Sequence, residues 1–265
     1  MTILKLLLVA TVLPIYQMSR EQLDAYLSEL HTCKPSLNSR IKDVLERSLG
    51  TPYVNGPLGE GPEGKYDTDP MMDLERVDCV TFVEQTLALA VATSYDSAFD
   101  TLQKIRYHHG RRKFEHRNHF MIADWIADNS FCRDITGKCG AVTAEVTRII
   151  SKKDFFEKVK APELGKNTPD RQITIYYIPS DAAGKAVVAM PSPALVVFIG
   201  KVEWLFALHA GFFVRKGDRP LLYHASSKSG DVTTTDFLSY IKEQSDRYIG
   251  YTVYALDEVN LPAGN

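Results

Sequence analysis

The stretch Asp78-Cys79-Val80-Thr81-Phe82-Val83-Glu84 is the most informative part of this 265-residue chain. Apolar residues recur at steps of three and four from position 80 to position 90, which predicts a helix. Asp78 is a favoured N-cap residue, so Cys79 lies in the first turn, where free backbone N–H groups and the helix dipole favour a negative charge. A free cysteine is most often a buried core residue. The position directly after the cap instead favours a nucleophilic thiolate with a lowered pKa.

Two histidines far downstream are candidates for the base that such a thiol needs. His209 lies in residues 205–214 and His224 in residues 221–227, and both segments are rich in aromatic and β-branched residues, which predicts strands. The polar turn 215–220 between them predicts a hairpin. If both histidines share one face, one can deprotonate Cys79 while the other orients its imidazole. The alternative is that each is a hydrogen-bonded core residue.

The pattern along the chain changes from helical to β, which predicts an α+β fold with N-terminal helices packed on an antiparallel sheet. A loop rich in Gly and Pro precedes the cysteine helix. Further helices are predicted at 19–30, 36–49, 97–108, 118–128, 151–159 and 234–244. Further strands are predicted at 173–178, 195–199 and 251–254. The absence of a linker favours one domain over residues 18–265, with helical insertions at about 95–170.

The composition excludes several classes of partner. Hydrophobic residues make up 45% of the chain, which is enough for a sizeable core, and the net charge of −2 does not favour nucleic acid. No segment has the roughly 18 consecutive apolar residues of a membrane span, so we expect no stable membrane insertion. We expect a monomer.

Several motifs together resemble the papain-like NlpC-type cell-wall hydrolases, and most closely their N-acetylmuramoyl-L-alanine amidase-like branch. The likeness covers about residues 40–255. Its motifs are Asp-Cys-Val-Thr-Phe-Val-Glu at 78–84, His-Ala-Gly-Phe at 209–212, His-Ala-Ser-Ser at 224–227, Gly-Thr-Pro-Tyr at 50–53, Ile-Arg-Tyr at 105–107 with Gly110, Arg-Asn-His-Phe at 117–120 and Asp-Trp at 124–125. The chain departs from the pattern at Ala210, where many relatives have Val, and it lacks the Gly-Asp pair that commonly begins the His209 strand.

The resemblance implies a cysteine amidase in a papain-like fold. Cys79 attacks a carbonyl, His209 acts as general base and then acid, and His224 orients His209. The bond joins the lactyl group of N-acetylmuramic acid to L-alanine, and the implied substrate is a small anhydro-muramoyl peptide released during bacterial wall turnover. This chemistry needs no metal and no organic cofactor. Asp78 supports the nucleophile. Tyr53 either helps the Cys79 N–H to hold an oxyanion or packs under the loop.

The family-like segment Arg117-Asn118-His119, with Trp125, is predicted to line the substrate cleft. A tryptophan ring can stack on a sugar, although it is more often part of a core. Such side chains suit a sugar with an acetamido group better than an extended peptide.

Three alternatives compete with this interpretation. The first is a γ-D-glutamyl endopeptidase on the same fold. The second is a zinc-dependent amidase that uses His116 and His119, three residues apart, although the surrounding Arg and Lys residues oppose a cation. The third is a non-catalytic wall-binding module, which the presence of Cys79, His209 and His224 argues against.

A wall substrate favours export, and we expect a periplasmic location. Residues 1–17 contain Lys5 followed by a short apolar run, which is typical of a signal peptide, but no Ala-x-Ala cleavage site follows. The alternative is an apolar segment packed on the domain. In an oxidising compartment, Cys132 and Cys139 are expected to form a disulfide across their short loop, which leaves Cys33 unpaired.

Overall fold

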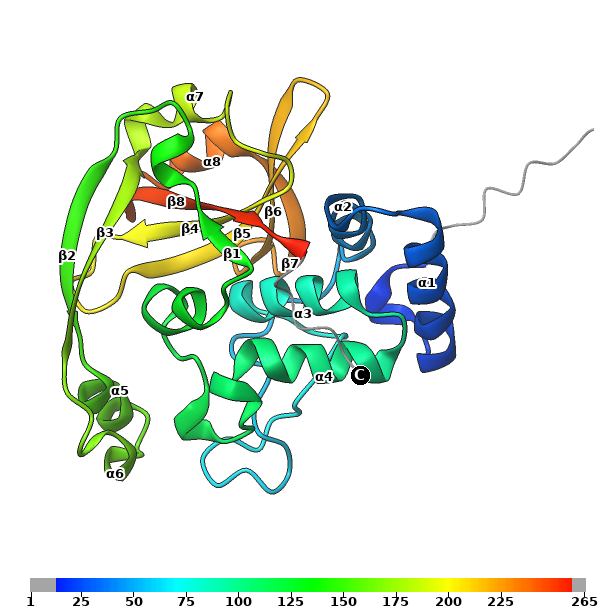
Figure 1. Cartoon of the computed structure of the whole chain (residues 1–265), viewed down its shortest axis with the longest axis horizontal. Helices are drawn as coiled ribbons and strands as arrows, with labels where there is room; N and C mark the ends of the chain where they lie inside the picture. The colour runs from blue at the N-terminus through cyan, green and yellow to red at the C-terminus, as the bar shows by residue number, and fades with distance from the viewer. Residues whose placement is uncertain (1–12, 259–265) are drawn as a thin grey trace, which may run out of the picture.

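The computed structural model describes residues 13–258 and joins a group of helices to an antiparallel sheet (Figure 1). The α+β class predicted from the sequence is therefore confirmed. The longer helices are α1 (Arg20–Cys33), α2 (Leu37–Arg47), α3 (Cys79–Val91) and α4 (Tyr95–Arg106). The shorter ones are α5 (Lys152–Lys158), α6 (Pro162–Gly165), α7 (Ala183–Ala186) and α8 (Phe237–Glu243).

The sheet has eight strands, in the order β2-β3-β8-β4-β5-β6-β7, with β1 paired to β8. Their bounds are β1 Cys132–Asp134, β2 Ala144–Ile150, β3 Arg171–Pro179, β4 Ala194–Gly200, β5 Ala207–Lys216, β6 Arg219–Ser226, β7 Asp231–Asp236 and β8 Tyr248–Leu256. The β2–β3 hairpin extends away from the rest of the sheet and carries α5 and α6 at its tip (Figure 1).

Both faces of the sheet are covered, and β4 shows this most clearly because all of its residues are buried. Leu195 and Val197 point into the core shared with the helices α1 to α4. Val196 and Phe198 point into a second core on the opposite face, where α7 and α8 pack. Helix α3 packs against β5 on the first face, where the rings of Phe82 and Phe212 meet edge to face with centroids 6.0 Å apart.

Local capping explains where the N-terminal helices begin. The Ser19 hydroxyl accepts the backbone N–H of Gln22, and the Gln22 side chain accepts the N–H of Ser19, which is a capping box before α1. The Ser36 hydroxyl caps α2 by accepting the backbone N–H of Ser39. The predicted helices at 19–30 and 36–49 are thus confirmed, with ends that shift by a few residues.

Two predicted helices are corrected. The predicted helix 234–244 begins only at Phe237, because Asp231–Asp236 pairs with β6 as the edge strand β7 and Asp236 then caps α8. The predicted helix 118–128 is a π-helical segment, Met121–Ile126. Strand β2 was not predicted. It alternates exposed and buried residues in a hairpin with β3, and its partner lies more than 20 residues away in sequence.

The two ends of the chain bear on the predicted signal segment and disulfide. Residues 1–12 lie outside the described residues, whereas Ile15, within the short 3-10 helix Ile15–Gln17, is buried in the main core. Cys132 and Cys139 are separate buried thiols that belong to different cores, so the expected disulfide is not present in this structure. Within residues 13–258 no helix is both long enough and apolar enough to cross a membrane.

Candidate active site

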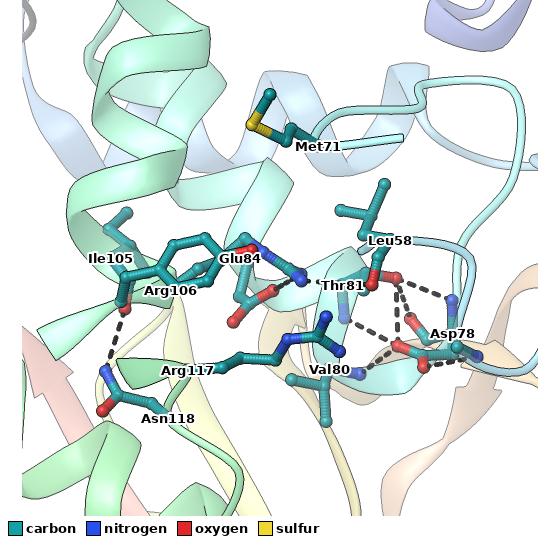
Figure 2. Close-up of polar contacts among 12 residues, drawn as sticks. Leu58, Met71, Asp78, Val80, Thr81, Glu84, Ile105, Arg106, Arg117 and Asn118 are labelled. Carbon is teal, nitrogen blue, oxygen red and sulfur yellow. Dashed lines mark hydrogen bonds and ion pairs between the residues drawn. The ribbon is translucent and has the colours of Figure 1, made fainter. Parts of the chain in front are cut away.

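Cys79 is the first residue of α3, and the carboxylate of Asp78 fixes it there (Figure 2). Asp78 Oδ1 accepts the backbone N–H groups of Val80 at 3.0 Å and Thr81 at 2.7 Å. The Thr81 hydroxyl in turn accepts the Asp78 N–H at 2.8 Å, which completes a capping box. The second oxygen of Asp78 accepts the N–H of Gly56 at 3.0 Å. One carboxylate therefore starts the helix and ties the preceding loop to it.

The thiol is protonated in the free protein at neutral pH. Burial raises the pKa of Cys79 well above its usual range, and the Asp78 charge raises it further, while the backbone N–H groups of Ala210, Cys79 and Val80 lower it. The expected lowering of the Cys79 pKa by the helix terminus is therefore wrong, because loss of solvation outweighs the helix dipole. A thiol in this state needs a neighbouring base before it can act as a nucleophile.

The two histidines meet on adjacent strands, as the hairpin prediction required. His209 Nε2 and His224 Nδ1 are 2.7 Å apart, and their rings stand nearly perpendicular at 84°. Strand β5 pairs with β6 through Phe212 and Tyr223. Gly211 directly precedes Phe212 on β5. Its lack of a side chain leaves room for the contact between the two histidines, since a Cβ atom at position 211 would lie 3.0 Å from the Cβ of His224.

The hydrogen-bonding partners of the two rings limit which of their nitrogens can accept a further proton. His224 Nε2 lies 3.4 Å from the hydroxyl of Thr235 on β7. Since Nε2 of His209 is engaged with His224, its Nδ1 is the nitrogen left to accept a proton. In that state His209 Nε2–H donates to His224 Nδ1, and His224 Nε2–H donates to Thr235. Thr235 escaped the sequence analysis because β7 was taken for a helix.

Burial keeps both imidazoles neutral. It lowers the pKa of His209 to about 3, with smaller contributions from His224 and Arg247, and it lowers the pKa of His224 to about 4. The ring of Phe198 stacks on His209 at 5.9 Å, and Tyr240 packs against both histidines at 5.9 and 5.0 Å. A neutral His209 can accept a proton throughout the neutral pH range.

One cavity of about 460 Å³ brings together Cys79, both histidines and Tyr53. Its volume is that of a site for a small ligand. The remaining lining residues lie on β5, on β6, β7 and the turn between them, and on α8, the turn after it and the start of β8. They are Leu208, Ala225, Ser226, Ser227, Lys228, Ser229, Thr233, Thr235, Tyr240, Glu243, Gln244, Arg247 and Tyr248. Most of these were missed because isolated polar residues in turns carry no motif.

Tyr53 reaches the cavity from the loop before α3. Its backbone N–H donates to the Gly230 carbonyl at 2.8 Å, and the N–H of Val54 donates to the Val77 carbonyl at 2.9 Å. Burial raises the pKa of Tyr53, and the neighbouring Cys79 and Asp78 raise it further. The phenol therefore keeps its proton and can donate a hydrogen bond into the cavity.

The four residues predicted to line the substrate cleft are not among the residues that line this cavity. Arg117 makes ion pairs with Glu60 at 2.6 Å and Asp67 at 2.9 Å. The Asn118 side chain donates to the Ile105 carbonyl at 3.4 Å (Figure 2). Their place in the family-like segment led to the prediction, but each is engaged within the fold.

His119 and Trp125 are also packed within the fold and do not line the cavity. His119 packs against Phe114, Phe155 and Phe156, its Nε2 lies 2.8 Å from the Phe114 carbonyl, and burial lowers its pKa to about 3. Trp125 is 0% exposed, so its ring cannot stack on a sugar. The zinc alternative has no matching cluster: residues 13–258 contain no group of three or more His, Cys, Asp or Glu residues that could hold a metal.

A buried ion pair lies beneath the reactive helix (Figure 2). Arg106 Nη1 lies 2.7 Å from Glu84 Oε2, and each side chain is 4% exposed. Arg106 also donates to the carbonyl of Leu58, so the pair links α3 and α4 to the loop that carries Tyr53 and leads to Asp78. Glu84, the last residue of the motif 78–84, is therefore part of the buried framework of the fold.

One family model matches most of this chain. A family model described as AmiA-like, N-acetylmuramoyl-L-alanine amidase-like, matches residues 43–249, a range that contains Cys79, His209 and His224. A crystal structure of a protein from Legionella pneumophila str. Philadelphia 1 is similar with 25% identity and a TM-score of 0.80, over 92% of this chain and 96% of that one. No match was found among curated proteins.

Two further crystal structures share the fold. An N-acetylmuramoyl-L-alanine amidase from Bacteroides uniformis has 22% identity and a TM-score of 0.65, over 84% of this chain and 99% of that one. A putative xylanase from Bacteroides fragilis has 23% identity and a TM-score of 0.63, over 80% and 99%. At these identities the likeness concerns the fold alone.

The buried ion pair yields a stability prediction. Arg106→Met leaves the Glu84 carboxylate buried without its partner, so we expect the free energy of unfolding at pH 7 to fall by about 3–5 kcal/mol in urea titrations. The double variant Arg106→Met/Glu84→Met should be more stable than Arg106→Met alone, because no charge is then left unpaired. Additive losses in the double variant would contradict the role of the pair as one unit.

The protonated thiol yields a second prediction. The rate of Cys79 alkylation by iodoacetamide should rise as the pH increases from 6 to 9, because a raised pKa leaves little thiolate at neutral pH. The measurement is best made in a Cys33→Ser background, which removes the exposed thiol. A rate that stays flat over this range would show a thiolate that is already formed at pH 6.

Proposed function

Because this chain belongs to the N-acetylmuramoyl-L-alanine amidase-like family, we propose that it is a cysteine amidase acting on peptidoglycan fragments. The bond is the amide between the lactyl group of N-acetylmuramic acid and L-alanine, with the anhydro sugar as the preferred form. The observation that carries the proposal is that Cys79 and the hydrogen-bonded pair His209–His224 line one cavity. A capped helix that presents a cysteine to histidines on a sheet is also the arrangement expected of a papain-like fold.

The reaction begins with transfer of the thiol proton. His209 Nδ1 accepts the proton of Cys79 as the sulfur attacks the carbonyl carbon of the lactyl group. The imidazolium that forms is oriented by its Nε2–H bond to His224, and His224 is held in turn by Thr235. Since both histidines are neutral before the reaction, the positive charge arises only as the negative charge develops on the substrate.

The tetrahedral intermediate places a negative charge on the former carbonyl oxygen. The backbone N–H of Cys79, in the first turn of α3, and the phenol of Tyr53 are the donors proposed for it. His209 then protonates the leaving nitrogen, the C–N bond breaks, and the peptide departs with a free amino terminus. Water, deprotonated by His209, hydrolyses the thioester and releases the lactyl carboxylate.

The size of the cavity favours a fragment over polymeric glycan. About 460 Å³ accommodates a small ligand, whereas an extended glycan strand needs an open groove.

We further propose that the enzyme acts in the periplasm, where such fragments arise, and cell fractionation tests this location.

Cys79→Ser should lower kcat for hydrolysis of the muramoyl-peptide amide by at least about a thousandfold. An alcohol has a much higher pKa than a thiol and is a far weaker nucleophile towards this amide. The stability of the protein should change little. Cys33→Ser is the matched control, since it makes the same replacement at an exposed thiol outside the cavity. Near wild-type activity in Cys79→Ser would remove this residue from the mechanism.

The two histidines should differ in a predictable order. His209→Ala should cost more activity than His224→Ala, because His209 transfers the proton whereas His224 holds its tautomer and orientation. Thr235→Val should cost least, since its contact with His224 is long at 3.4 Å. If His224→Ala proves the worse of the two in kcat/KM, the roles of the histidines must be exchanged.

The bond and the substrate are tested together by mass spectrometry. Purified anhydro-muramoyl peptides should be cut between the sugar and L-alanine, with little release from intact sacculi, and exhaustive chelation should leave the rate unchanged. Cleavage after D-glutamate would move the function to a γ-D-glutamyl endopeptidase. Loss of activity on chelation with recovery by zinc would favour the metal alternative instead.

A further inference from the structure

The wall of the cavity carries two cations that the proposed chemistry does not use. Lys228 lies in the turn between β6 and β7, and Arg247 lies in the turn between α8 and β8. Both are exposed, and neither forms an ion pair with a carboxylate of residues 13–258. Glu243 is the one carboxylate in the lining, so the lining has an excess of positive charge.

Arg247 is held in place by its neighbours. Its Nη1 donates to Gln244 Oε1 at 3.3 Å, and its guanidinium lies over the ring of Tyr248 at 5.5 Å. Its backbone carbonyl accepts the N–H of Lys201 at 3.0 Å. A guanidinium that is already oriented loses less side-chain entropy when it binds a ligand, and its planar fork matches a carboxylate.

The position of Arg247 relative to Cys79 and His209 indicates which part of a substrate its guanidinium contacts. Arg247 lines the same cavity of about 460 Å³ as Cys79 and His209, so a ligand group bound to Arg247 lies in the same cavity as the scissile bond. On the acyl side of that bond, the N-acetylated sugar and its lactyl group carry no charge. On the leaving side, the peptide has carboxylates from its second residue onward. A cavity with excess positive charge and low-dielectric walls attracts such a group.

We infer that Lys228 and Arg247 bind carboxylate of the leaving peptide and make the enzyme selective for an acidic peptide. The inference rests on the proposed function, because it assigns the peptide portion of that substrate to this side of the cavity. Lys228 supplies a mobile charge on a flexible stem, whereas Arg247 supplies a fixed, planar one. The two cations are therefore specificity determinants, and the proton transfers do not involve them.

The test compares two ligands that differ only in charge: N-acetylmuramoyl-L-alanyl-D-glutamate and its diamide. Their Kd values are measured with Cys79→Ala protein, and their kcat/KM values with active enzyme. We expect the acid to bind about 10–100-fold more tightly than the diamide, the range of a hydrogen bond to a charged group. Arg247→Gln and Lys228→Gln should each reduce this preference, and the double variant should reduce it to within about twofold.

The matched control is Lys242→Gln, which removes one positive charge from α8 at an exposed position outside the cavity lining. It should leave the preference for the acid unchanged, which separates direct binding from the overall field of the protein. Equal Kd values for the two ligands in the parent protein would overturn the inference. So would variants that weaken acid and diamide equally, since that result indicates a purely structural role.

The kinetic measurement keeps the two proposals apart. If neither ligand is cut between the lactyl group and L-alanine, the proposed function fails, while the Kd comparison still decides whether the cations select a carboxylate. If both ligands are cut at equal kcat/KM and bind equally, the proposed function stands and the inference fails.

Discussion

The carboxylate of Asp78 is the contact on which the geometry of the site depends. It accepts N–H groups from Val80 and Thr81 on one side and from Gly56 on the other. The first set begins α3 and places Cys79 at its first position. The second draws in the loop that brings Tyr53 to the same cavity. A substitution that removed this carboxylate would expose helix N–H groups and release the loop together.

Burial then sets the electrostatic character of the site. Both histidines lie against aromatic side chains, and burial favours the neutral form of the histidines and of the thiol. The helix dipole alone would favour a thiolate, yet its effect is smaller than the cost of removing a charge from water. In the proposed mechanism, charge therefore develops only during the reaction, where donors aimed at the substrate can stabilise it.

The polar residues that support this arrangement lie behind it. Glu84 and Arg106 pair within the core, and Arg117 pairs with Glu60 and Asp67 of the loop. Arg106 also donates to the Leu58 carbonyl, so residues more than 20 positions apart in sequence connect the loop to α3 and α4. A segment that looks like a substrate-binding motif in the sequence is thus part of the frame that holds the loop.

The sequence by itself determined the α+β class, most of the helices and the identity of Cys79 and the two histidines as candidates. Capping residues and apolar periodicity act over a few positions, so Asp78 and the stripe after it were sufficient to predict α3. Only the tertiary structure decided that His209 and His224 meet at 2.7 Å, that Thr235 joins them from an edge strand, and that Trp125 belongs to the core. Strand register, burial and the resulting pKa shifts depend on contacts between segments far apart in the chain, and local patterns contain no information about those distances.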